Sequence, residues 1–194
     1  MPFSLANTPT VELPSGIELF RIQYKSANKN SKRINRHILP SPEIIPDNTR
    51  FGLDGQNVAY YGGSELTALY ETYFRREQNK SISKDILKKR NLIVFKSKSN
   101  LRLLDLRGMA ADYPFLYSMR YEKTKEISQK CFDAGYDGII YMSAQHVNHD
   151  CYCLYERGMR KLKAIEELPL IDPISDNYLY SIYEASTSSG VLIL

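Results

Sequence analysis

Alternating hydrophobic and polar positions mark the first elements of this chain. Residues 17–24 alternate in part, which predicts a first strand that carries Arg21. A second short strand is predicted at 57–61 and ends at a pair of glycines. Ser64 then has the right identity for a helix N-cap, and the apolar residues after it recur at helical spacing. The pattern therefore predicts a strand, a tight turn and a helix in succession.

The later periodic segments mix short strands with helices. They predict helices at 83–90 and 121–134, and strands at 91–96, 101–106, 139–142 and 151–155. No βαβ rhythm and no Gly-x-Gly-x-x-Gly turn is visible, which argues against a Rossmann fold. We therefore expect an α+β fold built on antiparallel β-sheets flanked by helices.

Two stretches lack such periodicity. Residues 25–49 are polar, then basic, then rich in proline, which predicts a long loop. Beyond residue 158 we expect a C-terminal extension, because residues 185–190 have the composition of a linker. The expected organisation is a catalytic domain at 1–158 and an extension at 159–194 that packs on the same domain or is partly disordered.

Composition narrows the class of protein. The 194 residues, 43% hydrophobic and 25% charged, suit one globular domain with a core of its own. There is no run of about 18 apolar residues, so no membrane span is expected, and the N-terminus shows no secretory signal. Cys131, Cys151 and Cys153 lack CxxC spacing and further ligands, so we expect reduced, buried thiols, no metal site and a cytoplasmic protein.

Charge and aromatic content leave the partner open. The net charge is +4, and much of the basic character lies at 25–36 and 88–90. A solvated basic loop explains this better than direct nucleic-acid binding, because no nucleic-acid-reading motif accompanies it. Fifteen tyrosines suit either a ligand cleft or a partner interface, and a homo-oligomer is left open.

The stretch from Arg50 to Glu71 carries the most chemistry. It begins with a cation, crosses a short aromatic strand and ends with a carboxylate on the predicted helix. Glu71 falls about 100° from Tyr70 around that helix, at the edge of the apolar stripe, where it suits the rim of a cleft. This order fits an arginine that grips a phosphorylated sugar and a glutamate that stabilises a sugar cation. From these residues alone, a solvated glutamate and a surface arginine are the alternatives.

Three blocks of the sequence resemble the RES domain, a family named for its Arg, Glu and Ser. They are Leu-Phe-Arg-Ile at 19–22, the stretch from Arg50-Phe51 through Tyr60 to Glu71, and Tyr-Asp-Gly-Ile-Ile-Tyr-Met-Ser at 136–143. The resemblance runs from about Leu19 to Glu156. The chain departs from the family pattern at Asn48-Thr49, Gly52, Met142 and Gln145, where the family commonly has Gly-Gly, Asn, Pro and Arg.

This resemblance implies the fold of ADP-ribosyltransferase toxins and an NAD-degrading activity. Such a toxin cleaves the nicotinamide–ribose bond of NAD+ by hydrolysis or phosphorolysis, with NAD+ as substrate and no separate cofactor. The implied partner is a helix-turn-helix (Xre-type) antitoxin that covers the active site. Transfer of ADP-ribose to a macromolecule, and a catalytically inactive partner-binding module of the same fold, are the alternative hypotheses.

The resemblance assigns Arg50, Glu71 and Ser143 as the catalytic set. Glu71 would stabilise the positive charge that develops on the ribose, as carboxylates do in glycosidases. Arg50 would hold the pyrophosphate or the nearby ribose. Ser143 would orient a ribose or the carboxamide, because no Ser/His/Asp order makes it a nucleophile; a serine that satisfies a turn is the alternative.

Tyr60, Arg21 and Phe51 are assigned to substrate binding. Tyr60 would stack on nicotinamide, whereas Tyr61 points to the opposite face of a regular strand. For Arg21, a cation in the pocket and a buried structural arginine are both open. His146 and His149 follow Ser143 in a polar loop and are expected to be exposed.

Overall fold

The computed structural model describes residues 3–25, 33–40, 49–75, 80–117 and 121–194. The strands are β1 (Thr10–Leu13), β2 (Glu18–Tyr24), β3 (Val58–Gly62), β4 (Ser81–Ile82), β5 (Arg90–Ser97), β6 (Leu101–Asp105), β7 (Gly138–Met142), β8 (Asp150–Tyr155), β9 (Leu162–Pro169) and β10 (Leu192–Ile193). The helices are α1 (Glu65–Thr72), α2 (Lys84–Lys88), α3 (Glu122–Asp133), α4 (Glu156–Met159) and α5 (Tyr180–Ser189), with 3₁₀ turns η1 (Leu5–Asn7), η2 (Ile34–His37) and η4 (Pro114–Tyr117). None of the described helices is long and apolar enough to cross a membrane.

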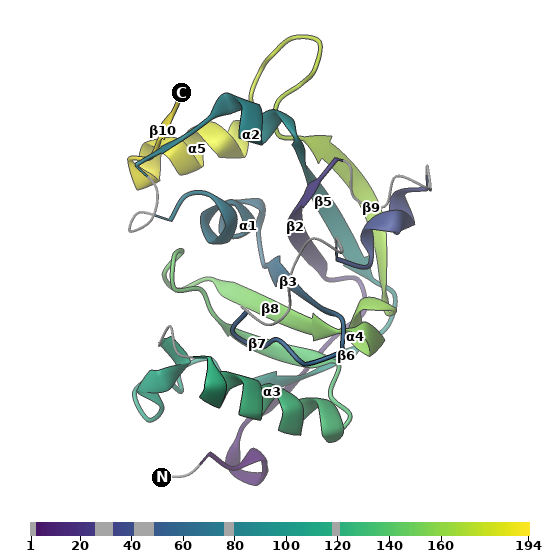
Figure 1. The fold of residues 1–194 in the computed structure, drawn as a ribbon. Helices are drawn as coiled ribbons and strands as arrows, with labels where there is room; N and C mark the ends of the chain where they lie inside the picture. Colours follow the sequence, from purple (N-terminus) through teal and green to yellow (C-terminus); the bar gives the residue numbers. More distant parts are fainter. Residues whose placement is uncertain (1–2, 26–32, 41–48, 76–79, 118–120) are drawn as a thin grey trace.

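Eight strands form one curled sheet in the order β1-β6-β7-β8-β3-β2-β5-β9 (Figure 1). All neighbours pair antiparallel except β6 and β7, which are parallel. The predicted α+β class is confirmed. The sheet departs from the expected antiparallel arrangement at one pair, because α3 lies in the connection between β6 and β7 and so lets them run parallel.

The inner face of the curled sheet forms the central core. Leu19, Phe95 and Leu103 lie there without solvent exposure, together with Tyr61. Because side chains alternate along a strand, the neighbouring Tyr60 points to the outer face. The two faces of β3 therefore separate a core tyrosine from a tyrosine that is available to a site.

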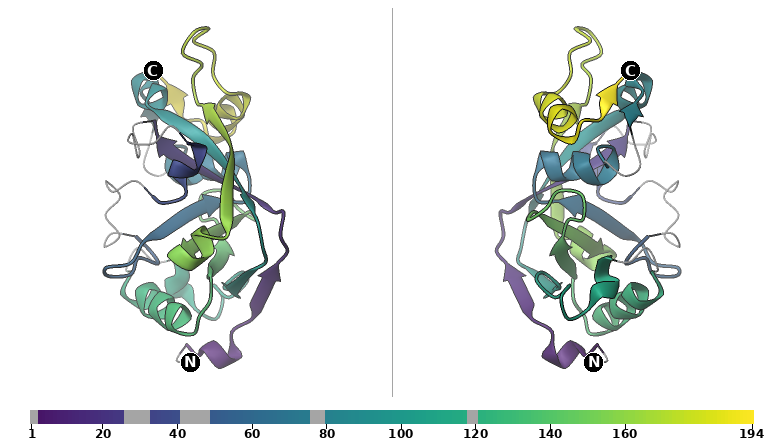
Figure 2. Two further views of the ribbon diagram at one scale, coloured as in Figure 1. Left: turned by 90° about the vertical axis from the view of Figure 1, so that its right-hand side faces the viewer. Right: turned by 90° about the vertical axis from the view of Figure 1, so that its left-hand side faces the viewer.

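Two groups of helices cover the outer face at opposite ends of the sheet (Figures 1 and 2). At one end α1 and α5 pack together over β2 and β5, with Leu69, Phe74 and Ile182 fully buried between them. At the other end α3 packs through Ile127 and Cys131 on β6, β7 and β8. The outer face between these two helical groups is where the cavity described below opens.

Residues beyond 158 belong to the folded structure. Strand β9 pairs along its length with β5, and β10 forms a small parallel sheet with β4. The linker interpretation of residues 185–190 was wrong, since these residues lie in α5 and end it at Gly190, which has a φ of 74°. Their serines are tolerated because Ile182 and Ala185 bury the helix against α1.

The described part of the predicted loop 25–49 contains a 3₁₀ turn. One guanidinium nitrogen of Arg36 in η2 donates to both carboxylate oxygens of Glu167 on β9, at 2.8 Å to each. The fully buried His37 lies beside the same carboxylate at 3.1 Å. This ion pair fixes η2 against the sheet edge, whereas residues 26–32 and 41–48 lie outside the described residues.

The turn from β3 into α1 brings the two halves of the central motif together. A Cβ at Gly62 would lie 2.5 Å from the backbone nitrogen of Ala68, so only glycine permits this close approach. Ser64 caps α1 as predicted, because its side chain accepts a hydrogen bond from the Thr67 amide. The helix therefore starts immediately above the sheet and carries Glu71 over its outer face.

A candidate active site between the two helical groups

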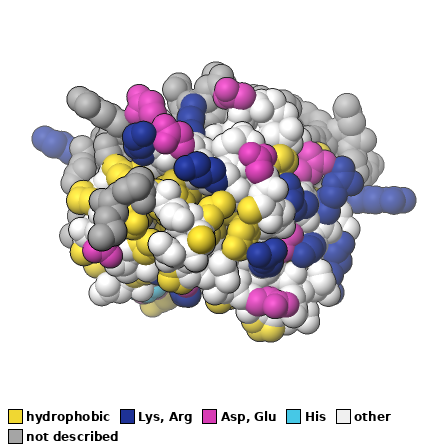
Figure 3. Space-filling view, turned by 90° about the horizontal axis from the view of Figure 1, so that it is seen from below, with side chains coloured by type: hydrophobic (Ala, Val, Ile, Leu, Met, Phe, Trp, Pro, Cys, Tyr) yellow, Lys and Arg dark blue, Asp and Glu magenta, His cyan; other side chains and the backbone are white. Residues whose placement is uncertain are grey.

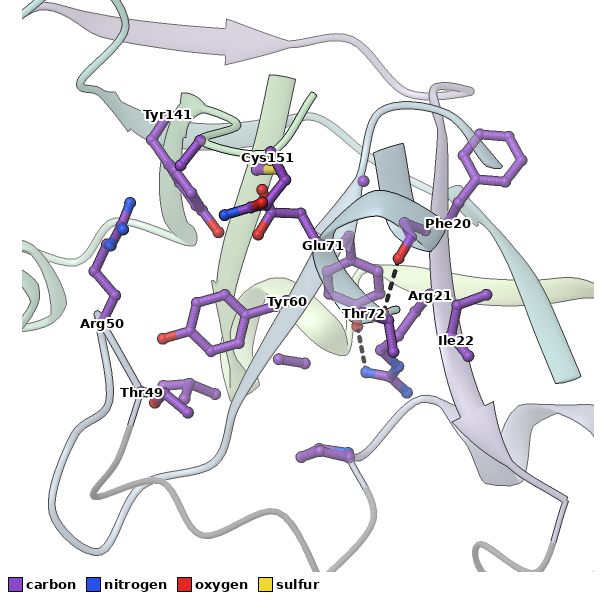
Figure 4. Close-up of a pocket in the computed structure, with 18 of the residues that line it drawn as sticks. Phe20, Arg21, Ile22, Thr49, Arg50, Tyr60, Glu71, Thr72, Tyr141 and Cys151 are labelled. Carbon is purple, nitrogen blue, oxygen red and sulfur yellow. Dashed lines mark hydrogen bonds between the residues drawn. The ribbon is translucent and has the colours of Figure 1, made fainter. Parts of the chain in front are cut away.

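A cavity of about 440 Å³ opens on the outer face of the sheet between α1 and Tyr121, the residue before α3. The close-up in Figure 4 shows Arg50, Tyr60, Glu71 and Tyr141 pointing into it from different elements. Glu71 comes from the last turn of α1, and Arg50 from the segment before β3. The structure thus brings the predicted cation and carboxylate to one cavity.

A residue in the connection between β7 and β8 holds the Glu71 side chain by a hydrogen bond. The Ser143 hydroxyl donates a hydrogen bond to Oε1 of Glu71 at 2.5 Å. The same hydroxyl oxygen accepts the amide hydrogens of Gln145 and His146 at 3.2 and 2.8 Å. Ser143 is buried and does not line the cavity itself, so its contact with the cavity runs through Glu71.

Arg50 is positioned by the residue that follows it. The amide of Phe51 donates to the Tyr60 hydroxyl at 2.8 Å, which ties this segment to β3. Among the described residues, none forms an ion pair with Arg50, and its guanidinium faces the cavity (Figure 4). An arginine held in this way can bind an anionic ligand through charge-assisted hydrogen bonds.

Tyr60 and Tyr141 line the wall of the cavity between Arg50 and Glu71. Burial raises the pKa of both phenols well above the ordinary value, so both are neutral at pH 7. Burial also raises the pKa of the Cys151 thiol beneath them. The thiol is therefore neutral at pH 7 and forms part of the cavity wall.

The structure places Phe51 and Arg21 differently from the catalytic set. Phe51 is 1% exposed, packs against Tyr141 in the core and does not line the cavity. Arg21 borders the cavity, but its guanidinium is buried on the inner face between the rings of Tyr61 and Phe95. It donates to the Tyr61 hydroxyl at 3.1 Å and to the carbonyl of His37, so it holds the end of η2 against the sheet.

Several cavity residues were not named from the sequence. Tyr141 could have been found, because it lies two positions before Ser143 and hence on the same face of β7. No sequence pattern pointed to Thr49, Arg75 or Arg90. These residues reach the cavity only through the packing of α1, β5 and the segment before β3. Arg75 also supports the helix end, because its Nε donates to the Glu71 carbonyl at 2.6 Å.

The cysteines and the surface charge add two observations. Cys131, Cys151 and Cys153 are free and buried, as expected. Among the described residues, no group of His, Cys, Asp or Glu is arranged to hold a metal ion. Viewed from the α3 end, Lys and Arg side chains gather toward one side, with acidic side chains among them (Figure 3).

Comparison with solved structures shows the class of fold. The chain is similar to a chain in the crystal structure of the MbcT–MbcA toxin–antitoxin complex of M. tuberculosis, with a TM-score of 0.60 and 12% sequence identity. The match covers 84% of this chain and 88% of the other. This likeness in fold agrees with the predicted mixed α+β class.

A family comparison identifies the chain more closely. The model of the RES domain matches residues 18–173, which is most of the chain. The protein therefore belongs to the RES domain family. No curated protein sequence matches the chain significantly.

Proposed function

We propose that this protein is the toxin of a toxin–antitoxin pair and that it cleaves the nicotinamide–ribose bond of NAD+ in the cytoplasm. The observation that carries the proposal is the convergence of Arg50 and Glu71 on one cavity lined by tyrosines. The RES family membership and the fold shared with a toxin–antitoxin complex support it. The cavity, of about 440 Å³, falls in the size range of small-molecule sites.

In the proposed reaction, the bond between the ribose C1′ and the nicotinamide nitrogen breaks. Its electron pair goes to the pyridinium ring, which leaves as neutral nicotinamide, and positive charge grows on the ribose. The Glu71 carboxylate stabilises this charge, and the acceptor, water or phosphate, then bonds to C1′ and loses a proton. NAD+ is the substrate, so no further cofactor is needed.

The other side chains bind and orient the substrate. Arg50 would pair with the pyrophosphate, for which a guanidinium on the wall of the cavity without an ion pair among the described residues is suited. The neutral ring of Tyr60 would stack on nicotinamide and exclude water from that face. The proposed partner is a helix-turn-helix antitoxin that blocks the opening of the cavity until it is removed.

Purified protein incubated with NAD+ alone tests this function. We expect stoichiometric free nicotinamide, measured by chromatography, together with ADP-ribose in water or, in phosphate buffer, ADP-ribose with phosphate on that same ribose carbon. The Glu71→Gln variant is the matched control and should release little nicotinamide. A strict requirement for an added macromolecule would favour ADP-ribose transfer, and no release under any condition would favour a partner-binding module.

A further inference from the structure

The serine that holds Glu71 has no hydrogen-bonding capacity left for a ligand. A serine hydroxyl has one hydrogen to donate and two lone pairs to accept with. Both lone pairs of Ser143 receive amide hydrogens, from Gln145 and His146, and its hydrogen goes to Glu71. The direction of this hydrogen therefore depends on where the loop that contains residues 145 and 146 is held.

Helix α1 holds that loop through a side-chain contact. The Oγ1 of Thr67 lies 2.9 Å from Nδ1 of His146, and Thr67 is completely buried. The same hydroxyl lies 2.8 Å from the Ser64 hydroxyl that caps the helix. Thr67 stands four positions before Glu71, so both side chains lie on one side of α1, one turn apart.

Stacked rings reinforce the contact. The His146 ring lies parallel to Tyr70 of α1, with centroids 4.7 Å apart, and parallel to His149 at 3.5 Å. The loop also closes on itself, because the Ser143 amide donates to the His149 carbonyl at 2.8 Å. His146 is thus packed between α1 and its own loop and is not an exposed loop histidine.

We propose that Thr67 and His146 are positioning residues for Glu71 that act through Ser143. The contacts form a closed circuit: α1 carries Glu71, Thr67 on the same helix holds His146, and the His146 amide orients the serine that binds Glu71. The circuit keeps one carboxylate oxygen fixed, so that the other can face the ribose without reorganisation. This inference rests on the proposed function for its kinetic consequence only.

Substitution of Thr67 separates its hydroxyl from its shape. Thr67→Val should lower kcat for nicotinamide release about tenfold, the rate equivalent of one neutral hydrogen bond, with KM nearly unchanged. Thr67→Ser, which keeps the hydroxyl, should restore most of kcat. His146→Phe keeps the ring stack but loses Nδ1, so it should match Thr67→Val, and the double variant should be no worse than either single one. Val147→Ala, at an exposed position of the same loop, is the control and should behave as wild type.

A second set of variants tests whether the effect of Thr67 on kcat acts through Ser143. In a Ser143→Ala background, Thr67→Val should have no further effect on kcat. Equal rates for Thr67→Val and wild type would overturn the proposal, as would a full tenfold loss that persists without Ser143. A loss that appears in KM, or that follows a collapse of the thermal midpoint, would show a structural role only.

A readout without turnover keeps this inference separate from the proposed function. The carboxyl ¹³C resonance of Glu71 should shift in Thr67→Val in the same direction as in Ser143→Ala, and should stay in place in Thr67→Ser. If the wild type releases no nicotinamide but the resonance behaves in this way, the proposed function fails and the positioning circuit stands. An unchanged Glu71 resonance in Thr67→Val would contradict the proposed positioning of Glu71, whatever the activity.

Discussion

The Ser143 hydroxyl donates to the Glu71 carboxylate at 2.5 Å across 72 positions of sequence. This contact joins the turn between β7 and β8 to the last turn of α1, on either side of the cavity. In this structure the hydroxyl contacts the Glu71 carboxylate, whereas the orientation of a ribose or carboxamide by Ser143 stays a prediction. The proposed catalytic group thus depends on two elements that are far apart in the chain.

Replacing Glu71 with Gln should abolish most catalysis without unfolding the protein. The amide keeps an oxygen that can accept from Ser143 but lacks the charge that stabilises the ribose cation, so kcat should fall about 100- to 1000-fold. The thermal midpoint should stay within about 2 °C of wild type, because the side chain is partly exposed at the cavity. Steady-state NAD+ consumption measures kcat, and calorimetry measures the thermal midpoint. An unchanged kcat would contradict the proposed role of Glu71.

Removing the Arg50 guanidinium should weaken substrate binding more than it slows the chemical step. Arg50→Ala should raise KM for NAD+ about 10- to 100-fold, the scale of one or two charge-assisted hydrogen bonds. Arg50→Lys should recover only part of this, because an ammonium cannot bind two phosphate oxygens in one plane. Lys163→Ala, at an exposed position on β9, removes one positive charge elsewhere and should leave KM unchanged.

The two cavity tyrosines should respond differently to loss of their hydroxyls. Tyr60→Phe leaves the Phe51 amide without its acceptor and should lower the free energy of unfolding by about 1–3 kcal/mol. Tyr141→Phe should change it by less than about 0.5 kcal/mol, since the structure gives that hydroxyl no hydrogen bond within the described residues. Urea denaturation compares the two; equal losses would show that the Phe51 contact contributes nothing.

Acidification should loosen the stacked loop. Burial lowers the pKa of His146, the nearby His149 lowers it further, and Glu71 opposes them. The Tyr70 ring and the Thr67 hydroxyl also pack against the imidazole. The unfolded chain therefore binds the proton first, so stability is full above about pH 6.5 and falls as the pH drops toward the lowered value.

His37 is also buried with a lowered pKa, so the pH effect of His146 requires a difference measurement. The free energy of unfolding of wild type relative to His146→Phe should fall as the pH drops below about 6.5 and should be constant above that pH. A difference that does not vary with pH would show that His146 titrates normally.

The C-terminal helix should contribute directly to stability. Ile182 is fully buried between α5 and α1, so Ile182→Ala should cost about 2–5 kcal/mol of unfolding free energy. Glu184→Ala on the exposed side of the same helix should cost less than about 0.5 kcal/mol. Chemical denaturation of both variants tests whether the residues beyond 158 stabilise the site-bearing helix.

The local elements around the site were predictable because backbone periodicity is written in short stretches of sequence. The strand ending at Gly62, the Ser64 cap and the position of Glu71 at the edge of the apolar stripe all follow from residues within one or two turns. The same reasoning failed for residues 185–190, whose serines suggest a linker. Burial of Ile182 and Ala185 against α1 makes them helical instead.

The sequence by itself determined the α+β class, the strand–turn–helix unit and the candidate cation and carboxylate. Only the tertiary structure decided which groups meet: it put Arg21 on the inner face, buried Phe51, added Tyr141 to the cavity and joined Ser143 to Glu71. The physical reason is that strand pairing and helix packing act between residues far apart in the chain. No local sequence pattern specifies such pairing, so the direction of a hydroxyl or a guanidinium is set only when the strands pair and the helices pack.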